Sequence, residues 1–374
     1  MKNRTVMLFA LFLLIISCTS NEETYTVETI DGVKHIHNLA PAWGSDQKIE
    51  LEFVRKIGGI EVDDEDYLLM KPRDCVRDSE GNHYIIHDDD KHVVKYDKDW
   101  KRLGSFCDTG QGPGEIEGSY GAEIDTNVLF VVNAGLGGFR IEKIDFDGNA
   151  IDRIQIPRQA FDVSIQKSGN LVLPGKSFQS LTGEEFSEPF VAVILDNSGG
   201  ITKYFCIGEK FPSRREMSFM NNIKLGLDSK DNIYITFQSH NRIDKYSPDG
   251  DFIFTMTRSL NYEVVHGVEK FTDSAGRERE YPIPANVSNY IRIDSKDRLW
   301  ASTYNRQPED KGSTGSTLKE EGIIDFDIFD SEGIFLTRIT SPVRFYKHRI
   351  YDDLLYLIDP YHETCIYIYR IIEK

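Results

Sequence analysis

The segment from residue 87 to residue 92 is the densest group of potential metal ligands in the sequence. It reads His-Asp-Asp-Asp-Lys-His and contains the candidates His87, Asp88, Asp90 and His92. Carboxylates suit Ca²⁺, whereas imidazoles suit a transition metal such as Zn²⁺. The spacing is not that of an EF-hand, so a solvated acidic turn is the competing interpretation. His348 is a further candidate, although a single histidine within a strand is more often structural.

No sequence motif names a reaction. Patterns for a serine nucleophile elbow, a zinc-protease helix, a phosphate-binding loop and a dinucleotide fingerprint are missing from the sequence. The segment 110–114 is rich in glycine, but Pro113 and the lack of a helical pattern after it favour a tight turn over a phosphate cradle. We therefore predict no catalytic residue.

Short alternating apolar segments, separated by turns rich in Asp, Gly, Asn and Ser, make up most of the chain. This pattern indicates β-strands joined as hairpins. In the clearest unit, residues 223–256, four such segments follow one another, which we term strands a to d. A unit of about 35 residues with four strands is the size of one propeller blade.

Five complete units can be aligned through their turns between strands a and b, at residues 78–82, 125–127, 167–170, 228–232 and 294–297. A sixth unit near the C-terminus has strands b and c but no strand d. Residues 51–58 match a d strand and have no a, b or c strand of their own. We therefore predict an all-β, six-bladed propeller of four-stranded antiparallel blades, in which this segment completes the last blade and closes the ring. A β-sandwich, or a ring of five or seven blades, is the alternative.

Two segments carry a resemblance to a known family. Residues 241–246 followed by Asp249-Gly250 are similar to the NHL-type repeat, and residues 110–116 resemble the GxGPGEF signature of NHL-like six-bladed propeller lipoproteins of Bacteroidetes, with Ile116 in place of phenylalanine. Residues 31–33 and 38–43 also resemble that family's N-terminal segment. The resemblance implies a fold and a location in the cell envelope, but no reaction.

The first residues have the features of an export signal. Lys2 and Arg4 precede the apolar stretch 6–16, which is shorter than the roughly 20 residues that cross a bilayer. Residues 15–18 resemble the bacterial lipobox, which implies lipidation of Cys18; an ordinary signal peptide is the alternative. We expect a signal peptide over 1–17, a lipidated tether and N-terminal segment over 18–50, and the propeller over 51–374. The expected location is the outer membrane, facing either the periplasm or the exterior.

The composition is that of an acidic, folded protein. The 374 residues include 61 acidic and 44 basic side chains, and the net charge of −17 argues against a nucleic-acid partner. Four cysteines follow the lipobox, with no CxxC pair, at positions 75, 107, 206 and 365. We expect buried free thiols, although an oxidising compartment would permit disulfides.

The longer insertions should all lie on one side of the ring. In an antiparallel blade, the b–c turns share one face with the links between blades, and the other turns share the opposite face. The insertions belong to the first group: 107–119, 178–188, 209–220, 262–287 and 307–321. Long loops on a rigid scaffold commonly carry binding residues, so we expect ligand binding on this face. Drift through tolerated insertion is the alternative.

Strand a lines the central channel, so its first residues should lie near the mouth on that face. The predicted set mixes aromatic rings with hydrogen-bonding groups: Arg73, Asp74, Tyr120, Asp162, Asn222, Lys224, Asn289, Tyr290, Tyr346 and Lys347. This mixture suits a polar organic ligand such as a glycan or a peptide. Polar channel residues that only hold water are an equally open interpretation.

These observations favour a non-catalytic binding module for a glycan, a peptide or a partner protein, with no cofactor and with a lipid anchor as its contact with the membrane. The rival is a metal-dependent enzyme, because propellers with NHL-like repeats include lyases and lactonases with the metal in the channel. Calcium or zinc would then need inner-strand ligands, for which Glu123, Asp162, Asn222, Asn289 and His348 are available. A structural subunit of an outer-membrane uptake complex is a third hypothesis. Ser274 lies in a triplet that resembles the short O-glycosylation motif of Bacteroidetes.

Overall fold

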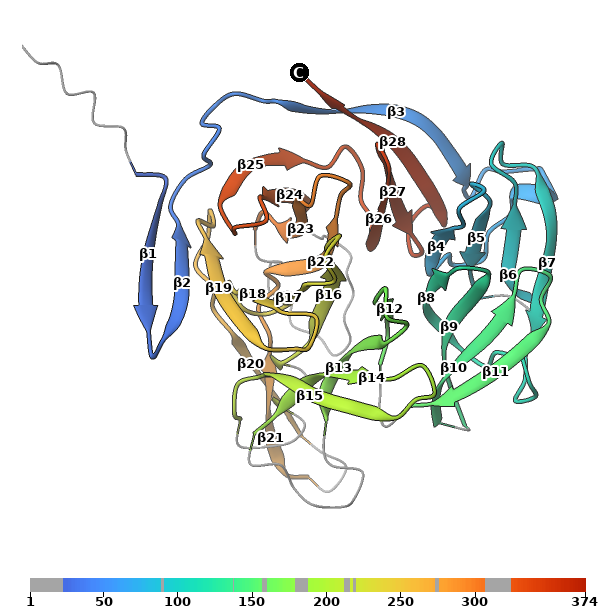
Figure 1. The fold of residues 1–374 in the computed structure, drawn as a ribbon, viewed down its shortest axis with the longest axis horizontal. Helices are drawn as coiled ribbons and strands as arrows, with labels where there is room; N and C mark the ends of the chain where they lie inside the picture. Colours follow the sequence, from blue (N-terminus) through green and yellow to red (C-terminus); the bar gives the residue numbers. More distant parts are fainter. Residues whose placement is uncertain are drawn as a thin grey trace, which may run out of the picture.

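The computed structural model describes residues 23–88, 91–136, 138–156, 160–178, 188–211, 216–217, 220–272, 276–306 and 324–374. Within these ranges the chain forms six β-sheets arranged in a ring, each built on a four-stranded antiparallel meander (Figure 1). The fold is the predicted all-β, six-bladed propeller. No helix among the described residues is long and apolar enough to cross a membrane.

Each blade runs outward from its inner strand. Blade one comprises β4 (Asp74–Arg77), β5 (His83–Ile86), β6 (Lys91–Tyr96) and β7 (Arg102–Asp108). Blade two comprises β8 (Ser119–Asp125), β9 (Val128–Gly135), β10 (Gly138–Asp145) and β11 (Ala150–Gln155). Blade three comprises β12 (Ser164–Ile165), β13 (Leu171–Phe178), β14 (Phe190–Leu195) and β15 (Ile201–Ile207).

The second half of the ring follows the same order. Blade four comprises β16 (Ile223–Leu227), β17 (Ile233–Phe237), β18 (Ile243–Tyr246) and β19 (Phe252–Arg258). Blade five comprises β22 (Ser288–Ile293), β23 (Leu299–Tyr304), β24 (Ile324–Phe329) and β25 (Phe335–Thr340). Blade six comprises β26 (Lys347–Tyr351), β27 (Leu354–Asp359), β28 (Cys365–Glu373) and β3 (Ile49–Gly58). A single 3₁₀ turn, η1 (Glu65–Tyr67), is described between β3 and β4.

A recurring aspartate explains why the short turns of the repeat close so regularly. Oδ1 of Asp78 accepts hydrogen bonds from the backbone N–H groups of Glu80 and Asn82, and Asp228 does the same two and four residues on. A carboxylate that caps its own turn in this way favours the turn over continued strand. These turns therefore fix where each strand ends and the next begins.

The ring closes as predicted. Strand β3 pairs antiparallel with β28, with Gly58 opposite Cys365 and Ile49 opposite Glu373. Gly58 has φ +78°, and a Cβ placed there would lie 2.9 Å from the side chain of Leu69, so this end of the closing strand requires glycine. The outer edge of blade six is thus supplied by a segment that lies some 300 residues earlier in the chain, roughly the full length of the propeller.

A hairpin that the sequence did not predict precedes the closing strand. It comprises β1 (Tyr25–Ile30) and β2 (Val33–Asn38), and β2 adds parallel to β19 at the outer edge of blade four. The side chain of Asn38 then bonds to the backbone of Gly333 and Phe335, in blade five. The N-terminal segment therefore spans blades four, five and six in succession, which ties neighbouring blades together.

The hydrophobic core lies between adjacent blades. For example, Ile194 of blade three packs in one buried cluster with Ile223 and Ile235 of blade four. The four cysteines are buried and free, as expected. Burial raises the pKa of the Cys107 and Cys206 thiols to about 12, so both remain protonated at neutral pH.

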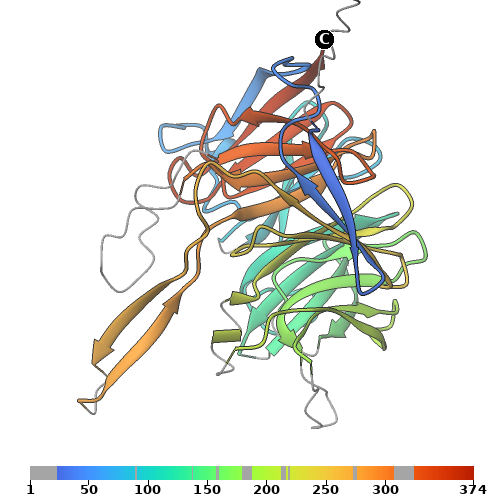
Figure 2. The ribbon, with the colours of Figure 1, turned by 90° about the vertical axis from the view of Figure 1, so that its left-hand side faces the viewer.

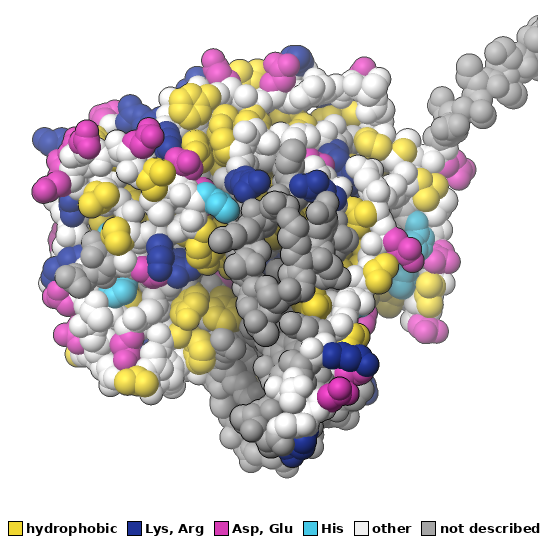
Figure 3. All heavy atoms as spheres, turned by 180° about the vertical axis from the view of Figure 1, so that it is seen from behind, with side chains coloured by type: hydrophobic (Ala, Val, Ile, Leu, Met, Phe, Trp, Pro, Cys, Tyr) yellow, Lys and Arg dark blue, Asp and Glu magenta, His cyan; other side chains and the backbone are white. Residues whose placement is uncertain are grey.

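One insertion forms an arm on the predicted binding side. Strands β20 (Gly267–Thr272) and β21 (Glu278–Ile283) pair as a two-stranded hairpin in the link between blades four and five. Figure 2 shows that this hairpin projects well beyond the body of the propeller. Figure 3 views the molecule from the side toward which it projects, where basic, acidic, histidine and hydrophobic side chains are interspersed on the surface.

Candidate functional site

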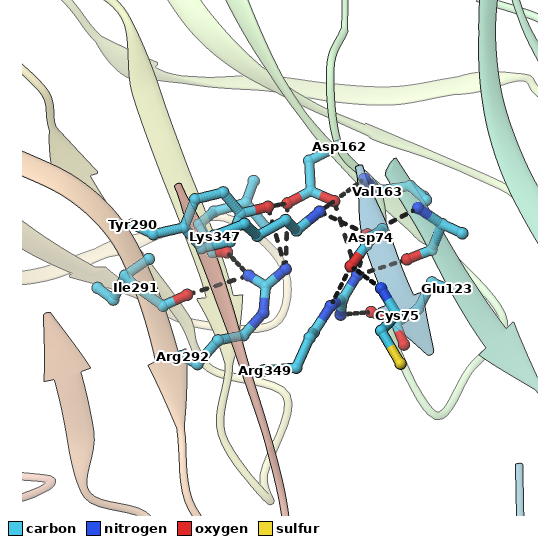
Figure 4. Close-up of polar contacts among 12 residues, drawn as sticks. Asp74, Cys75, Glu123, Asp162, Val163, Tyr290, Ile291, Arg292, Lys347 and Arg349 are labelled. Carbon is cyan, nitrogen blue, oxygen red and sulfur yellow. Dashed lines mark hydrogen bonds and ion pairs between the residues drawn. The ribbon is translucent and has the colours of Figure 1, made fainter. Parts of the chain in front are cut away.

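The predicted channel residues divide into two layers. Asp74, Asp162, Tyr290 and Lys347 are at most 2% exposed and form a buried cluster in the channel. The outer layer, at the mouth, includes Arg73 and the partly exposed Tyr120 and Tyr346. We name the inner cluster the plug; it consists of Asp74, Glu123, Asp162, Tyr290, Arg292, Lys347 and Arg349 (Figure 4).

Asp74, at the start of the inner strand of blade one, organises one half of the plug. Its carboxylate accepts from Nζ of Lys347 at 2.5 Å, and from Nε and Nη2 of Arg349 at 2.9 and 2.8 Å. The backbone N–H of Ala122 also donates to it, at 3.0 Å. Arg349 in turn pairs with Glu123 at 2.7 Å. Blades one, two and six are thus joined across the channel.

Asp162 of blade three organises the other half. It accepts from Nζ of Lys347 at 3.2 Å, from Nη2 of Arg292 at 3.1 Å and from the hydroxyl of Tyr290. Gly121 allows the backbone of blade two to lie close to Asp162, because a Cβ at that position would lie 2.8 Å from Oδ1 of Asp162. Lys347 contacts both aspartates and so links the two halves of the plug.

The charges of the plug balance and their ionisation is fixed. Burial alone would raise the pKa of Asp74, but Arg349 and Lys347 outweigh it and lower that pKa to about 2. Burial acts on Asp162 in the same direction, and Lys347 and Arg292 overcome it, so this pKa is also lowered. Burial raises the pKa of Tyr290 well above its usual value. The phenol therefore stays protonated, and both aspartates stay ionised near neutral pH.

The mouth contains an open cavity of about 470 Å³. It is lined by residues of blade one, the link from blade one to blade two and the start of blade two: Arg73, Asp88, His92, Thr109, Glu117, Gly118, Ser119 and Tyr120. The volume is within the range of small-molecule sites, roughly 300–1,000 Å³. Its lining comes from a b–c turn and a blade link, the elements predicted to share the binding face.

Arg73 is held rigidly in this cavity. Its Nε and Nη2 donate to Oδ2 of Asp88 at 3.1 and 2.6 Å, and its Nη1 donates to the hydroxyl of Tyr361 at 2.9 Å. The ring of Tyr361 meets that of Tyr346 edge to face, with 5.4 Å between centroids. Tyr120, Tyr346 and Tyr361 are 39%, 37% and 45% exposed, so aromatic surface surrounds a pre-positioned guanidinium.

The remaining predicted mouth residues anchor neighbouring loops. The amide of Asn222 bonds to the side chain of Gln238, in the b–c turn of blade four. The amide of Asn289 donates to the backbone carbonyl of Tyr346 at 2.6 Å. Lys224 lies deeper, and its Nζ is 5.4 Å from the centre of the Tyr290 ring. Asn289 therefore fixes backbone at the mouth, and Asn222 holds the side chain of Gln238.

The metal candidates are engaged in other contacts where the structure describes them. Asp88 pairs with Arg73, and the ring nitrogens of His92 lie 3.2 Å from the carbonyl of His87 and 3.1 Å from the hydroxyl of Thr109. His348 is buried edge-on against the rings of Tyr290, Phe326 and Phe345. Burial lowers its pKa well below the usual value, so it is neutral.

Within the described ranges, no three His, Cys, Asp or Glu side chains are grouped to hold a metal ion. Asp90, Cys18 and Ser274 lie outside the described residues, so the metal, lipidation and glycosylation sites stay predictions.

Arg292, Arg349 and Tyr361 are the important residues missing from the predicted site. The two arginines follow Tyr290 and Lys347 by two positions, and side chains two apart share one face of a strand. This alternation along the strand could have identified both arginines from the sequence. Tyr361 lies between β27 and β28, in a b–c turn on the predicted face.

The fold and the mouth together define a six-bladed propeller with a plugged channel and an open, aromatic rim. No protein-family profile and no curated protein matches the chain. A structure of a DUF4221 family member from Bacteroides vulgatus is similar with a TM-score of 0.61 at 10% identity, and covers 87% of this chain and 99% of that one. A Bacteroides fragilis structure named "putative exported protein" has a TM-score of 0.55 at 13% identity, covering 91% of this chain and 100% of its own.

The same fold occurs in a further structure, the PQQ-bound form of aldose sugar dehydrogenase from Streptomyces coelicolor. Its TM-score is 0.50 at 11% identity, with 87% of this chain and 99% of that chain covered. At such low identities the likeness shows a shared fold alone. The propeller is thus shared with Bacteroides proteins and with an enzyme, and the fold by itself selects no function.

Proposed function

We propose that the protein is a non-catalytic binding module that takes a carbohydrate at the mouth of its channel. The observation that carries this proposal is the cavity of about 470 Å³ in which Arg73 is pinned between Asp88 and Tyr361. Of the glycan, peptide and protein ligands that the sequence leaves open, a glycan fits this combination best.

The chemistry of the rim supports a carbohydrate. A sugar ring has an apolar face that packs on aromatic rings, and hydroxyls that need both donors and acceptors. Tyr120, Tyr346 and Tyr361 supply exposed ring surface, while Arg73 donates and Asp88 accepts. Tyrosine offers a large contact area at low entropic cost. Because Arg73 is already held in place, little further ordering is needed on binding.

The fixed ionisation of the acids in the plug favours a binding function over a catalytic one. General acid–base catalysis favours groups whose pKa lies near the working pH. Asp74 and Asp162 are instead held ionised by buried cations, and His348 is held neutral by burial. The channel acids that a metal-dependent lyase or lactonase would employ are therefore already committed to ion pairs. An enzyme remains the alternative that metal analysis of the purified protein would favour, if calcium or zinc survived dialysis.

We further propose that the protein is exported and anchored through a lipidated Cys18, so that the propeller meets its ligand at the cell envelope. Two or more acyl chains are needed for stable anchoring. Metabolic labelling with an alkyne fatty acid tests this, with Cys18→Ser as the control. Label on the wild type and none on the variant is expected; equal labelling, or no labelling, would refute the anchor.

A glycan array probed with the full-length protein tests the ligand assignment. We expect binding to at least one glycan, and a loss of roughly tenfold or more for Arg73→Gln, since a charged hydrogen bond contributes about 1.5–3 kcal/mol. Arg370→Gln is the matched control, because Arg370 is half exposed on the outer strand pair of blade six. Binding of peptides alone, or equal binding by both variants, would overturn the carbohydrate assignment.

A further inference from the structure

Among the channel side chains that the structure describes, the plug and Lys224 together contain one more cation than carboxylates. Three carboxylates of the plug, from Asp74, Glu123 and Asp162, face three cations, from Arg292, Lys347 and Arg349. Lys224 of the inner strand β16 adds a fourth cation beside this balanced set. This surplus positive charge is notable in a chain whose net charge is −17.

Lys224 is buried without an acceptor for its ammonium. It is 8% exposed, and among the described residues its side chain forms neither a hydrogen bond nor an ion pair. Its nearest recorded partner is the ring of Tyr290, which is 5.4 Å from Nζ and is also flanked by Arg292 at 4.5 Å. Burial lowers the pKa of Lys224 and outweighs the opposing attraction of Asp162, so this ammonium has an anion in its vicinity but no direct acceptor in the described part of the chain.

A second donor beside the same ring also lacks an acceptor. The Nε–H of Arg292 is fully buried, and no hydrogen-bond partner is found for it in the part of the chain that the structure describes. The Nη atoms of that guanidinium are occupied, by Asp162 and by the carbonyls of Leu225 and Ile291. Two cationic groups around Tyr290 thus have unused donors.

The position of Lys224 connects it to the mouth. It follows by two positions Asn222, the residue just before β16, and Asn222 bonds to the side chain of Gln238 in the b–c turn on the binding side. Two residues of strand span about 7 Å. A group that enters the mouth along this strand would therefore meet Lys224 roughly one layer below the rim.

We propose that the channel below the mouth is a binding site for a small carboxylate, held by the ammonium of Lys224 and assisted by Arg292. The proposal rests on the proposed function and specifies its ligand class: a carbohydrate with an acidic substituent, such as a uronic acid. The sugar ring packs on the tyrosines of the rim, and its carboxylate supplies the direct acceptor for the ammonium of Lys224.

Thermal unfolding of the full-length protein in sodium formate tests the anion site with the smallest carboxylate. The remaining salt is a bulky sulfonate at constant ionic strength. Formate should raise the unfolding midpoint of the wild type and saturate, because a ligand that binds only the folded state stabilises it. Lys224→Met should abolish this response and Lys224→Arg should retain it. Lys230→Met, an exposed lysine in the a–b turn of the same blade, should respond like the wild type.

The outcomes separate the two proposals. A saturable response in Lys224→Met, or none in the wild type, would overturn the anion site. Glucuronate and glucose then test the joint claim: tighter glucuronate binding that Lys224→Met reduces to the level of glucose supports it, and equal binding of both sugars overturns it. A formate response without any glycan on the array would refute only the carbohydrate assignment.

Discussion

The plug and the mouth are built from adjacent residues at the start of the same inner strands, yet they differ in burial and in the partners of their side chains. Arg73 and Asp74 are neighbours in the chain, as are Tyr346 and Lys347. Asp74 and Lys347 are at most 2% exposed and pair across blades, whereas Tyr346 is 37% exposed and its ring meets that of Tyr361 edge to face. Because successive side chains of a strand point to opposite faces, one residue joins the buried network while its neighbour in the chain lies on the recognition surface.

The difference shows what burial demands of polar groups. Charges removed from water must be matched, and the plug satisfies three acids with three cations contributed by blades that are distant in sequence. Groups at the rim remain hydrated, so they can be held in place and still be available to a ligand. Substitutions in the plug should therefore affect stability, and those at the mouth should affect binding.

The largest effect is expected from Asp74→Ala. This change leaves Lys347 and Arg349 buried with one fewer carboxylate, and breaking a buried ion pair from one side costs about 3–5 kcal/mol. Urea unfolding measures the loss. Asp74→Ala within about 1 kcal/mol of the wild type would show that the plug does not stabilise the ring.

The second-largest effect is expected from low pH, which should weaken the ion pairs of the plug. The pKa of Asp74 is lowered from 3.8 to about 2 in the folded state, so its contribution is complete above about pH 4 and is lost as the pH falls toward 2. The shift corresponds to about 2 kcal/mol. Unfolding free energies measured from pH 5 to pH 2 should fall less steeply in Asp74→Asn. Parallel curves for the variant and the wild type would contradict a lowered pKa of Asp74 in the folded protein.

Gly121→Ala should cost somewhat less, about 1–2 kcal/mol. The new methyl group would lie 2.8 Å from Oδ1 of Asp162 and 3.0 Å from the carbonyl of Phe161, and overpacking of this kind displaces its neighbours. The control is Gly267→Ala in β20, where the nearest atom is 3.4 Å away. Equal unfolding midpoints for the two variants would show that blades two and three are not held this close.

The smallest effect on stability is expected at the mouth. Asp88→Ala removes a partly exposed ion pair, which contributes at most about 1 kcal/mol. Its main consequence should be a less ordered Arg73 and weaker glycan binding. A loss of stability as large as that of Asp74→Ala would place Asp88 in the structural network instead.

The ring could be derived from the sequence because its signals are local. Turns capped by an aspartate and the alternation of each strand recur along the repeat, and the unmatched d strand at residues 51–58 predicted the closure found between β3 and β28. The hairpin at Tyr25–Asn38 could not be derived in this way. All six residues of β1 are exposed, so no buried face marks it, and its parallel pairing with β19 depends on an edge formed more than 200 residues later in the chain.

The site was partly predictable for a related reason. The positions along strand a predicted that four residues lie in the channel: Asp74, Asp162, Tyr290 and Lys347. These positions did not predict how deeply each side chain is buried. The bond between Tyr290 and Asp162 joins residues 128 positions apart, and it exists only once the ring has closed. The sequence could not show that these four side chains satisfy one another and leave the rim to Arg73, Tyr346 and Tyr361.

Calorimetric titration with the best glycan from the array tests the central claim most directly, by comparing two exposed tyrosines. Tyr361 lies beside Arg73 at the mouth, and Tyr25 is similarly exposed on the outer hairpin, at 41% against 45%. We predict that Tyr361→Ala raises the dissociation constant roughly tenfold, since stacked aromatic contacts are worth about 1 kcal/mol or more, while Tyr25→Ala leaves it unchanged. Unchanged affinity in Tyr361→Ala, or an equal loss in both variants, would contradict a binding site at the mouth.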